Sequence, residues 1–151
     1  MRIPFVASLA LAGVLYTTPA FAQQGSPPTT PTSVTRVTLI RIKPGHAAPF
    51  WNDVRQHQKP VIEEYKRRGI ITDYAVSTKV TTESENDWNV VTTITYKNYA
   101  ALDDLATRTD PVTLAHYGSA DARTAAGIAR TEHSTVVASF LVRNVTVNDW
   151  K

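Results

Sequence analysis

The amino-acid sequence predicts an α+β fold whose elements follow the order β-α-β-β-α-β. Stretches rich in β-branched residues stand at both ends of the folded region and in its middle. Two stretches of helical periodicity lie between them. Only a short polar turn separates the two central strands, which indicates an antiparallel hairpin. Together these observations predict a four-stranded antiparallel sheet with both helices on one face, which is the ferredoxin-like arrangement.

The first 22 residues are expected to be a signal peptide. Met1 and Arg2 give a positive start, residues 3–15 are mostly apolar, and Ala20-Phe21-Ala22 places small residues where signal peptidase reads them. This apolar stretch is shorter than the roughly 20 residues of a membrane-spanning helix. The alternative is a buried N-terminal strand or helix. Cleavage after Ala22 would export the chain to the periplasm or beyond, with no membrane association afterwards.

Composition bounds the rest of the chain. Of the 151 residues, 42% are hydrophobic and 19% charged, which fits one globular domain. No run of five like charges occurs, so a nucleic-acid partner is not expected. The absence of cysteine excludes disulfides, thiolate metal sites and a cysteine nucleophile.

Residues 23–33 contain three prolines and no large apolar residue, so they are expected to form a mobile linker. The domain is then 34–147, followed by a short tail, 148–151.

The first strand and the first helix are the clearest elements. Residues 34–43 alternate and are β-branched, and a Pro-Gly turn ends them. Residues 46–68 then follow a helical period, and Gly69 is expected to end the helix. Because Pro60 lacks a backbone N–H, a kink is expected near Gln56.

The second half of the domain begins with the predicted hairpin and ends with the longest strand. Asn98 is expected to cap a helix that the Asp110-Pro111 pair interrupts, and Gly118 weakens the middle of the helical piece that follows. The predicted strands are 70–82, 88–96 and 134–147, and the second helical piece is 112–128.

The strands carry apolar side chains on both of their faces. In the first strand, for example, Val37 and Leu39 oppose Ile40 and Ile42. A sheet with one solvated face shows a cleaner alternation than this. Because the sequence offers no third helix to cover the second face, a second copy of the chain is the simplest cover. Two such sheets would bury well over about 1,000 Å², so the predicted partner is the chain itself.

Four segments resemble the dimeric α+β-barrel superfamily, which includes antibiotic-biosynthesis monooxygenase-like, NIPSNAP-like and stress-responsive A/B-barrel proteins. They are VTLIRIKPGHAAPFW, IEEYKRRG, WNVVTTITYKNYAALDDL and the closing strand, and the resemblance covers about residues 34–147. It implies a homodimer whose two sheets form a barrel, with a pocket between sheet and helices in each subunit. The superfamily holds cofactor-free oxygenases, isomerases, haem proteins and members without known activity, so the fold leaves function open.

His57 is the candidate catalytic residue. On a helical wheel it lies about 20° from Phe50, so its imidazole is expected to face the sheet, where it would serve as a general base or bind a metal. The alternative is a core histidine bonded to a backbone carbonyl or a tyrosine. Glu64 lies one helical repeat along and would orient His57, or else is simply solvated.

A set of aromatic residues is available to line the pocket, because such residues give large apolar walls with a few polar groups. The alternative is that these rings fill the core or the dimer interface. His116 is expected on an irregular segment that forms either a lid over the pocket or an ordinary loop. The predicted pocket residues are Trp51, Tyr65, Tyr74, Trp88, Tyr96 and His116.

Several kinds of chemistry lack their motifs. The sequence has no HExxH or HxxxH pair, no Gly-rich phosphate loop and no G-x-S-x-G elbow, so no metal and no cofactor are expected. The favoured hypothesis is an exported dimer that binds a small apolar or aromatic molecule without transforming it. A cofactor-free oxygenase or isomerase that uses His57 is the alternative. Haem binding by a buried histidine is the third possibility.

Overall fold

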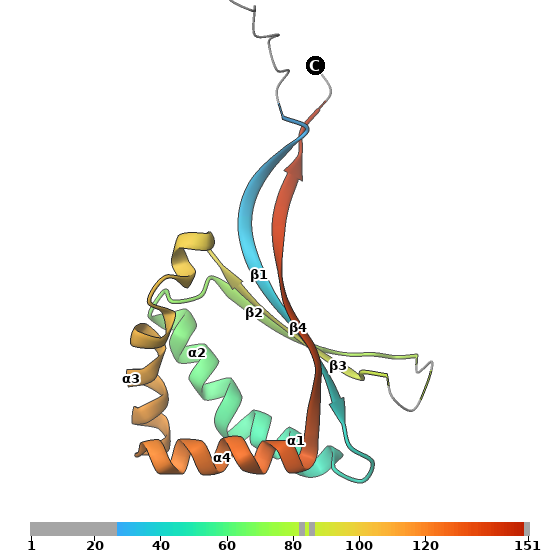
Figure 1. Cartoon of the computed structure of the whole chain (residues 1–151), viewed down its shortest axis with the longest axis vertical. Helices are drawn as coiled ribbons and strands as arrows, with labels where there is room; N and C mark the ends of the chain where they lie inside the picture. The colour runs from blue at the N-terminus through green and yellow to red at the C-terminus, as the bar shows by residue number, and fades with distance from the viewer. Residues whose placement is uncertain (1–26, 82–83, 85–86, 150–151) are drawn as a thin grey trace, which may run out of the picture.

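A computed structural model describes residues 27–81, 84 and 87–149 (Figure 1). The predicted signal peptide lies outside these residues. No helix among them is long and apolar enough to cross a membrane. The elements are β1 (Thr29–Ile42), α1 (Ala47–Asp53), the π-helical turn η1 (Val54–Gln58), α2 (Lys59–Arg67), β2 (Asp73–Thr78), β3 (Val90–Tyr96), the 3-10 turn η2 (Tyr99–Leu102), α3 (Leu105–Tyr117), α4 (Ala120–His133) and β4 (Ser134–Val147).

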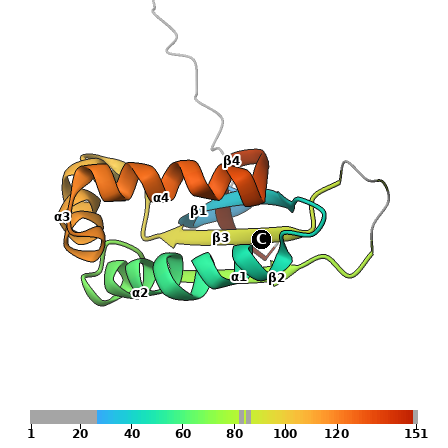
Figure 2. The ribbon, with the colours of Figure 1, turned by 90° about the horizontal axis from the view of Figure 1, so that it is seen from below.

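The sheet has the strand order β2-β3-β1-β4, and every neighbouring pair is antiparallel. All the helices lie on one face of this sheet (Figure 1). The segment α1–α2 and helix α4 form two sides of the helical layer, and α3 joins them at one end (Figure 2). The structure therefore confirms the predicted ferredoxin-like topology.

Strands β1 and β4 pair along their whole length and extend beyond the helices as a two-stranded ribbon (Figure 1). The pairing begins at Thr29 opposite Val147. Residues 29–33 are thus part of a strand, and the prediction that the linker reaches residue 33 is wrong for them. The reason is that the backbone partners of these residues lie in β4, far away in the sequence, and the proline-rich composition of the segment gives no sign of them. Asn148 extends this pairing, because its amide nitrogen donates to the Thr30 hydroxyl at 3.0 Å.

The first helix is interrupted where Pro60 predicts it. The backbone N–H of Lys59 donates to the carbonyl of Val54, five residues earlier, which closes the π-helical turn η1. Such a turn accommodates the missing N–H of Pro60 without breaking the helix. At the C-terminal end, Gly69 adopts φ +67°, and its N–H donates to the Lys66 carbonyl at 3.0 Å, as expected for a terminating glycine.

The third helix differs from its prediction. Pro111 lies inside α3 and does not interrupt it, and the break comes at Gly118 instead, which has φ +80°. One lost backbone hydrogen bond is tolerated here because Val112 is 3% exposed and packs in the core. Ser119 then caps α4 through its side chain, which accepts from the N–H of Ala122.

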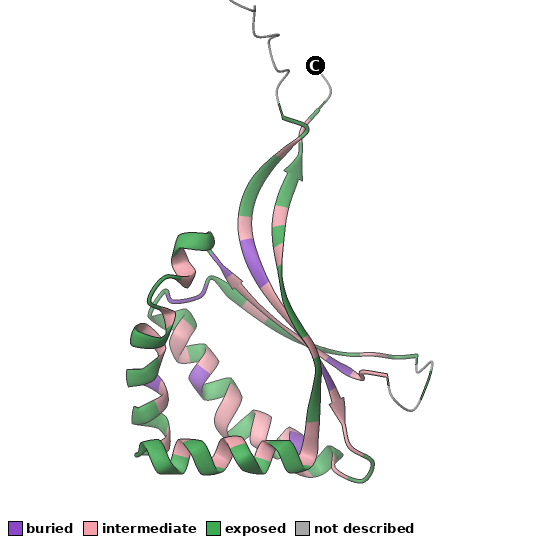
Figure 3. Ribbon diagram, in the orientation of Figure 1, coloured by how far each residue is buried: buried purple, intermediate pink, exposed green. Residues whose placement is uncertain are grey.

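The core lies between the helical layer and the sheet (Figure 3). The second strand is shorter than predicted, because Ile70 and Ile71 are both buried in this core and precede β2. One buried cluster consists of Val61, Ile70, Ile71, Tyr96 and Val112, and a second consists of Ile40, Phe50 and Val90.

Candidate functional site

One pocket among the described residues lies between the α1–η1–α2 segment and strands β2 and β3, and it is larger than the two hollows described below. Its volume is about 600 Å³. Because β2 is the edge strand of the sheet, the pocket lies at the side of the subunit and does not involve the β1–β4 ribbon. The residues that line it are Phe50, Trp51, Val54, Arg55, Gln58, Lys59, Ile62, Tyr74, Ala75, Val76, Thr92 and Ile94.

Two of the predicted pocket residues, Trp51 and Tyr74, line this cavity. The Trp51 ring packs edge-on against Phe50, with 5.0 Å between the ring centroids. Phe50 is only 2% exposed, so it gives Trp51 a fixed support. The Tyr74 hydroxyl donates to Glu63 Oε1 at 2.5 Å. This bond to a carboxylate, together with partial burial, raises the pKa of Tyr74 to about 12 and keeps the phenol neutral.

The polar side of the pocket comes from the helical segment. Arg55 donates to Asn52 Oδ1, and Gln58 donates to Asp53 Oδ2 at 2.7 Å. Lys59 follows at the start of α2 and is exposed. The sequence reasoning missed these three residues. A helical wheel of constant phase does not place them reliably, because Arg55 and Gln58 lie within the π-helical turn η1.

His57 does not line this pocket. Its Nδ1 atom lies 3.1 Å from Nε2 of His116, and its ring stacks on Tyr117 with 5.3 Å between centroids. The prediction that His57 faces the sheet is wrong, because the turn η1 holds one more residue than an α-turn. That extra residue shifts the phase of the helix by up to about 100° and turns His57 toward α3.

His116 and Tyr117 lie in the last turn of α3 and not in a loop. The Tyr117 hydroxyl accepts a hydrogen bond from Arg130 Nη2 at 2.6 Å, and Arg130 Nε donates to Asp53 Oδ2 at 2.9 Å. This chain of contacts ties α3 and α4 to the end of α1. His116 itself is exposed; it lines the smaller hollow between α2 and α3 and not the large cavity.

The chain's other two histidines also pair across the helical layer. Nδ1 of His46 lies 3.2 Å from Nδ1 of His133, at the junction of α1 with the end of α4. Among the described residues, no group of three or more potential metal ligands comes together. No histidine is among the described residues that line the large pocket.

Glu64 is held by two arginines. Its carboxylate accepts from Arg67 at 2.6 Å and from Arg68 at 2.7 Å. These two hydrogen bonds lower the pKa of Glu64 to about 2, and the bond from Arg67 has the larger effect. The expected pairing with His57 is not formed, because the arginines one turn further along the helix bind the carboxylate instead.

The remaining predicted aromatic residues lie away from the cavity. Tyr96 is buried and Tyr65 is half-buried in the core cluster around Val61, and burial raises the pKa of both phenols. Trp88 is half-buried at the base of the hairpin, with Lys79 Nζ 5.0 Å from its ring centroid. The core-filling alternative is therefore the right one for Tyr65 and Tyr96.

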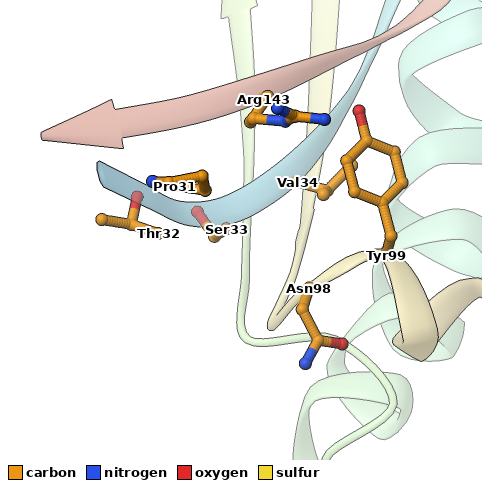
Figure 4. Close-up of a pocket in the computed structure, with 7 residues that line it drawn as sticks. All are labelled: Pro31, Thr32, Ser33, Val34, Asn98, Tyr99 and Arg143. Atoms are coloured by element: carbon orange, nitrogen blue, oxygen red, sulfur yellow. The ribbon is translucent and has the colours of Figure 1, made fainter. Parts of the chain in front are cut away.

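Two smaller hollows are present. One, of about 90 Å³, lies at the base of the ribbon, where the Arg143 guanidinium stands 5.4 Å from the Tyr99 ring centroid (Figure 4). The other, of about 260 Å³, lies between α2 and α3 beside Glu64 and His116. The first is too small for more than a few water molecules. The second is smaller than the roughly 300–1,000 Å³ of small-molecule sites, so the large cavity is the better candidate site.

The fold and the pocket together define a ferredoxin-like α+β protein with a lateral cavity. No protein-family model matches the chain, and no curated protein matches it. Among solved structures, it is similar to HapK from Hahella chejuensis, with 12% identity over 78% of this chain and 97% of that one, at a TM-score of 0.49.

Two further solved proteins to which the chain is similar are described as dimeric. A protein of unknown function from Bacteroides fragilis has 13% identity over 74% of this chain and 94% of its own, at a TM-score of 0.42. A ferredoxin-like protein from an uncultured marine organism has 16% identity over 80% of this chain and 100% of its own, at a TM-score of 0.47. Function does not follow from these similarities.

Proposed function

We propose that this chain is an exported homodimer that binds a small apolar or aromatic molecule in the cavity between α1–α2 and the sheet. The cavity carries the proposal. Its volume of about 600 Å³ lies within the usual range of roughly 300–1,000 Å³ for small-molecule sites. Its walls are mainly apolar and aromatic, and a few polar groups stand at one side, which is the usual composition of such sites.

Trp51 provides the test of the cavity. An aromatic side chain contributes about 1.5–3 kcal/mol when an apolar partner covers it. We therefore expect Trp51→Ala to weaken binding of the neutral fluorescent probe N-phenyl-1-naphthylamine at least tenfold. Trp88→Ala is the matched control, because Trp88 does not line the cavity. A wild-type protein that shows no saturable probe fluorescence would contradict the proposed binding function.

The dimer rests on the second face of the sheet. Thr35 Oγ1 lies 2.9 Å from Thr95 Oγ1, and Asn144 donates to Thr35 at 2.7 Å, so these side chains share one face. Ile94 and Tyr96 pack toward the helices on the other. Side chains alternate between the two faces along a strand, and residues opposite each other on neighbouring strands share a face. The pairing register therefore shows which residues lie at the centre of the open face. It consists of Val37, Leu39, Val91, Thr93, Ala138, Phe140 and Val142.

This open face is uncharged at its centre and needs another uncharged, apolar surface to cover it. None of its central side chains is charged, and Phe140 is 46% exposed. Four strands about 4.8 Å apart and about seven residues long span roughly 19 by 24 Å. Two such faces, with the projecting ribbon added, reach the range of about 1,200–2,000 Å² typical of stable interfaces. A second copy satisfies this need because a two-fold axis matches an uncharged patch with itself.

Phe140→Asp is the test of this dimer, since it places a charge at the centre of the patch. We expect the wild-type protein to sediment as a dimer at about 10 μM and the variant to sediment as a folded monomer. The control is Ile128→Asp, because Ile128 is 61% exposed on α4, away from the sheet. A monomeric wild-type protein at that concentration would refute the proposal.

A further inference from the structure

The cations of the first helical segment divide into two groups. Near its end, Lys66 binds Asp73 at 2.8 Å, and Arg67 and Arg68 both bind Glu64. At the pocket, Arg55 and Lys59 form no ion pair within the described residues. The Arg55 guanidinium donates a hydrogen bond to the neutral amide oxygen of Asn52. Within this segment, as far as the structure describes it, the two lysine or arginine side chains without a carboxylate partner are thus the two that line the cavity.

The position of these charges costs stability in the absence of a ligand. Arg55 and Lys59 are four residues apart, a spacing that places like charges on one flank and destabilises a helix by a few tenths of a kcal/mol. No acidic residue is among the described residues that line the cavity. Glu63 lies four residues after Lys59 on α2, but its carboxylate accepts from the Tyr74 hydroxyl and forms no ion pair with Lys59 within the described residues.

We infer that the ligand is a carboxylate with an apolar body, and that Arg55 and Lys59 bind its carboxylate while the apolar body lies between Trp51, Ile62 and Val76. This inference rests on the proposed binding function and specifies the class of ligand. Arg55 is suited to the role because a guanidinium donates two parallel hydrogen bonds to a carboxylate. Lys59 adds a second positive charge on the same flank. Apolar walls of low polarisability strengthen the field that both charges exert at the mouth of the cavity.

A matched pair of ligands tests the inference. Decanoate and decanol share the same chain and differ in the charge of the head group. By titration calorimetry at pH 7 and low ionic strength, we expect the wild-type protein to bind decanoate at least tenfold more tightly than decanol. Added salt should weaken decanoate binding and leave decanol binding unchanged, because exposed charges are screened.

Variants then assign the effect to these residues. Arg55→Gln and Lys59→Gln should each lower decanoate affinity about threefold to tenfold, the range expected for one exposed charged contact, and leave decanol affinity unchanged. Lys97→Gln is the control, because it removes the same charge from an exposed residue that does not line the cavity. If the net charge of the protein alone attracted decanoate, all three variants would lose decanoate affinity by the same factor.

The outcomes separate the inference from the function on which it rests. Equal affinity for decanoate and decanol, with both variants unchanged, would overturn the inference while the cavity remained a binding site. If decanoate, decanol and the neutral naphthylamine probe all failed to bind, the proposed function itself would fall. A preference for decanoate that persisted in a variant carrying both Arg55→Gln and Lys59→Gln would also overturn the assignment to these two residues.

Discussion

Asp53→Asn is the perturbation that tests the connection between the first helix and the α3–α4 pair. The Asp53 carboxylate accepts from Arg130 at 2.9 Å and from Gln58 at 2.7 Å. The side chains of Asp53 and Arg130 are 14% and 32% exposed, so solvent screens this pair only in part. An asparagine keeps the volume but removes the charge and one of the two acceptor oxygens.

The magnitude follows from this exposure. A hydrogen bond to a charged group contributes about 1.5–3 kcal/mol when buried, and an exposed ion pair contributes about 0.2–1 kcal/mol. We therefore expect Asp53→Asn to lower the free energy of unfolding by about 1–2 kcal/mol. For a folded body of about 120 residues, with an unfolding entropy of about 2.1 cal/mol/K per residue, this corresponds to a decrease in Tm of roughly 4–8 °C.

Urea unfolding monitored by circular dichroism is the assay, at one fixed protein concentration because dimerisation adds to stability. A double-mutant cycle with Arg130→Gln should give a coupling energy near 1 kcal/mol. Asp103→Asn is the control, because Asp103 is exposed and has no ion pair within the described residues. A coupling energy below about 0.3 kcal/mol, with Asp53→Asn as stable as the control, would refute the reasoning.

Further predictions concern the α3–α4 break, the pocket tyrosine and the histidine pair. Gly118→Ala should destabilise the protein by about 1 kcal/mol in urea unfolding, because Gly118 has φ +80°, whereas Gly127→Ala in the open middle of α4 should stabilise it by up to that amount. The raised pKa of Tyr74, about 12, means that the folded state holds this proton more tightly than the unfolded state does. Its contribution to stability is therefore complete below about pH 10 and lost as the pH rises toward 12. In the Glu63→Gln variant, phenolate absorbance should show that Tyr74 ionises at a lower pH than in the wild-type protein. An unchanged titration would contradict the view that the Glu63 carboxylate raises this pKa. His57→Ala should leave binding of the naphthylamine probe unchanged in fluorescence titrations, because His57 contacts His116 outside the cavity.

Much of the fold was predictable because strand and helix patterns depend on neighbouring residues. The last strand occupies residues 134–147 as its alternation predicts. The interruption near Gln56 follows from one property of Pro60, its missing N–H. The need for a covered second sheet face is likewise visible in the apolar residues on both sides of each strand, and the structure shows that face open.

The candidate site was only partly predictable. Trp51 and Tyr74 line the cavity as expected, because both side chains point from their elements into the space between helix and sheet. His57 does not, because the form of the interruption, a π-turn, changes the phase of the helix, and a helical wheel assumes a constant phase. Glu64 likewise has several partners within reach, and only the folded helix end selects Arg67 and Arg68.

By itself, therefore, the sequence determined the type and order of the elements, since these depend on local periodicity and on the backbone limits of proline and glycine. Tertiary structure alone decided that residues 29–33 join the sheet, that Pro111 is tolerated inside α3, and that Arg55 and Lys59 line the cavity. Each of these outcomes depends on contacts between residues far apart in the chain. The free energy of such contacts outweighs local preference, and no local pattern records it.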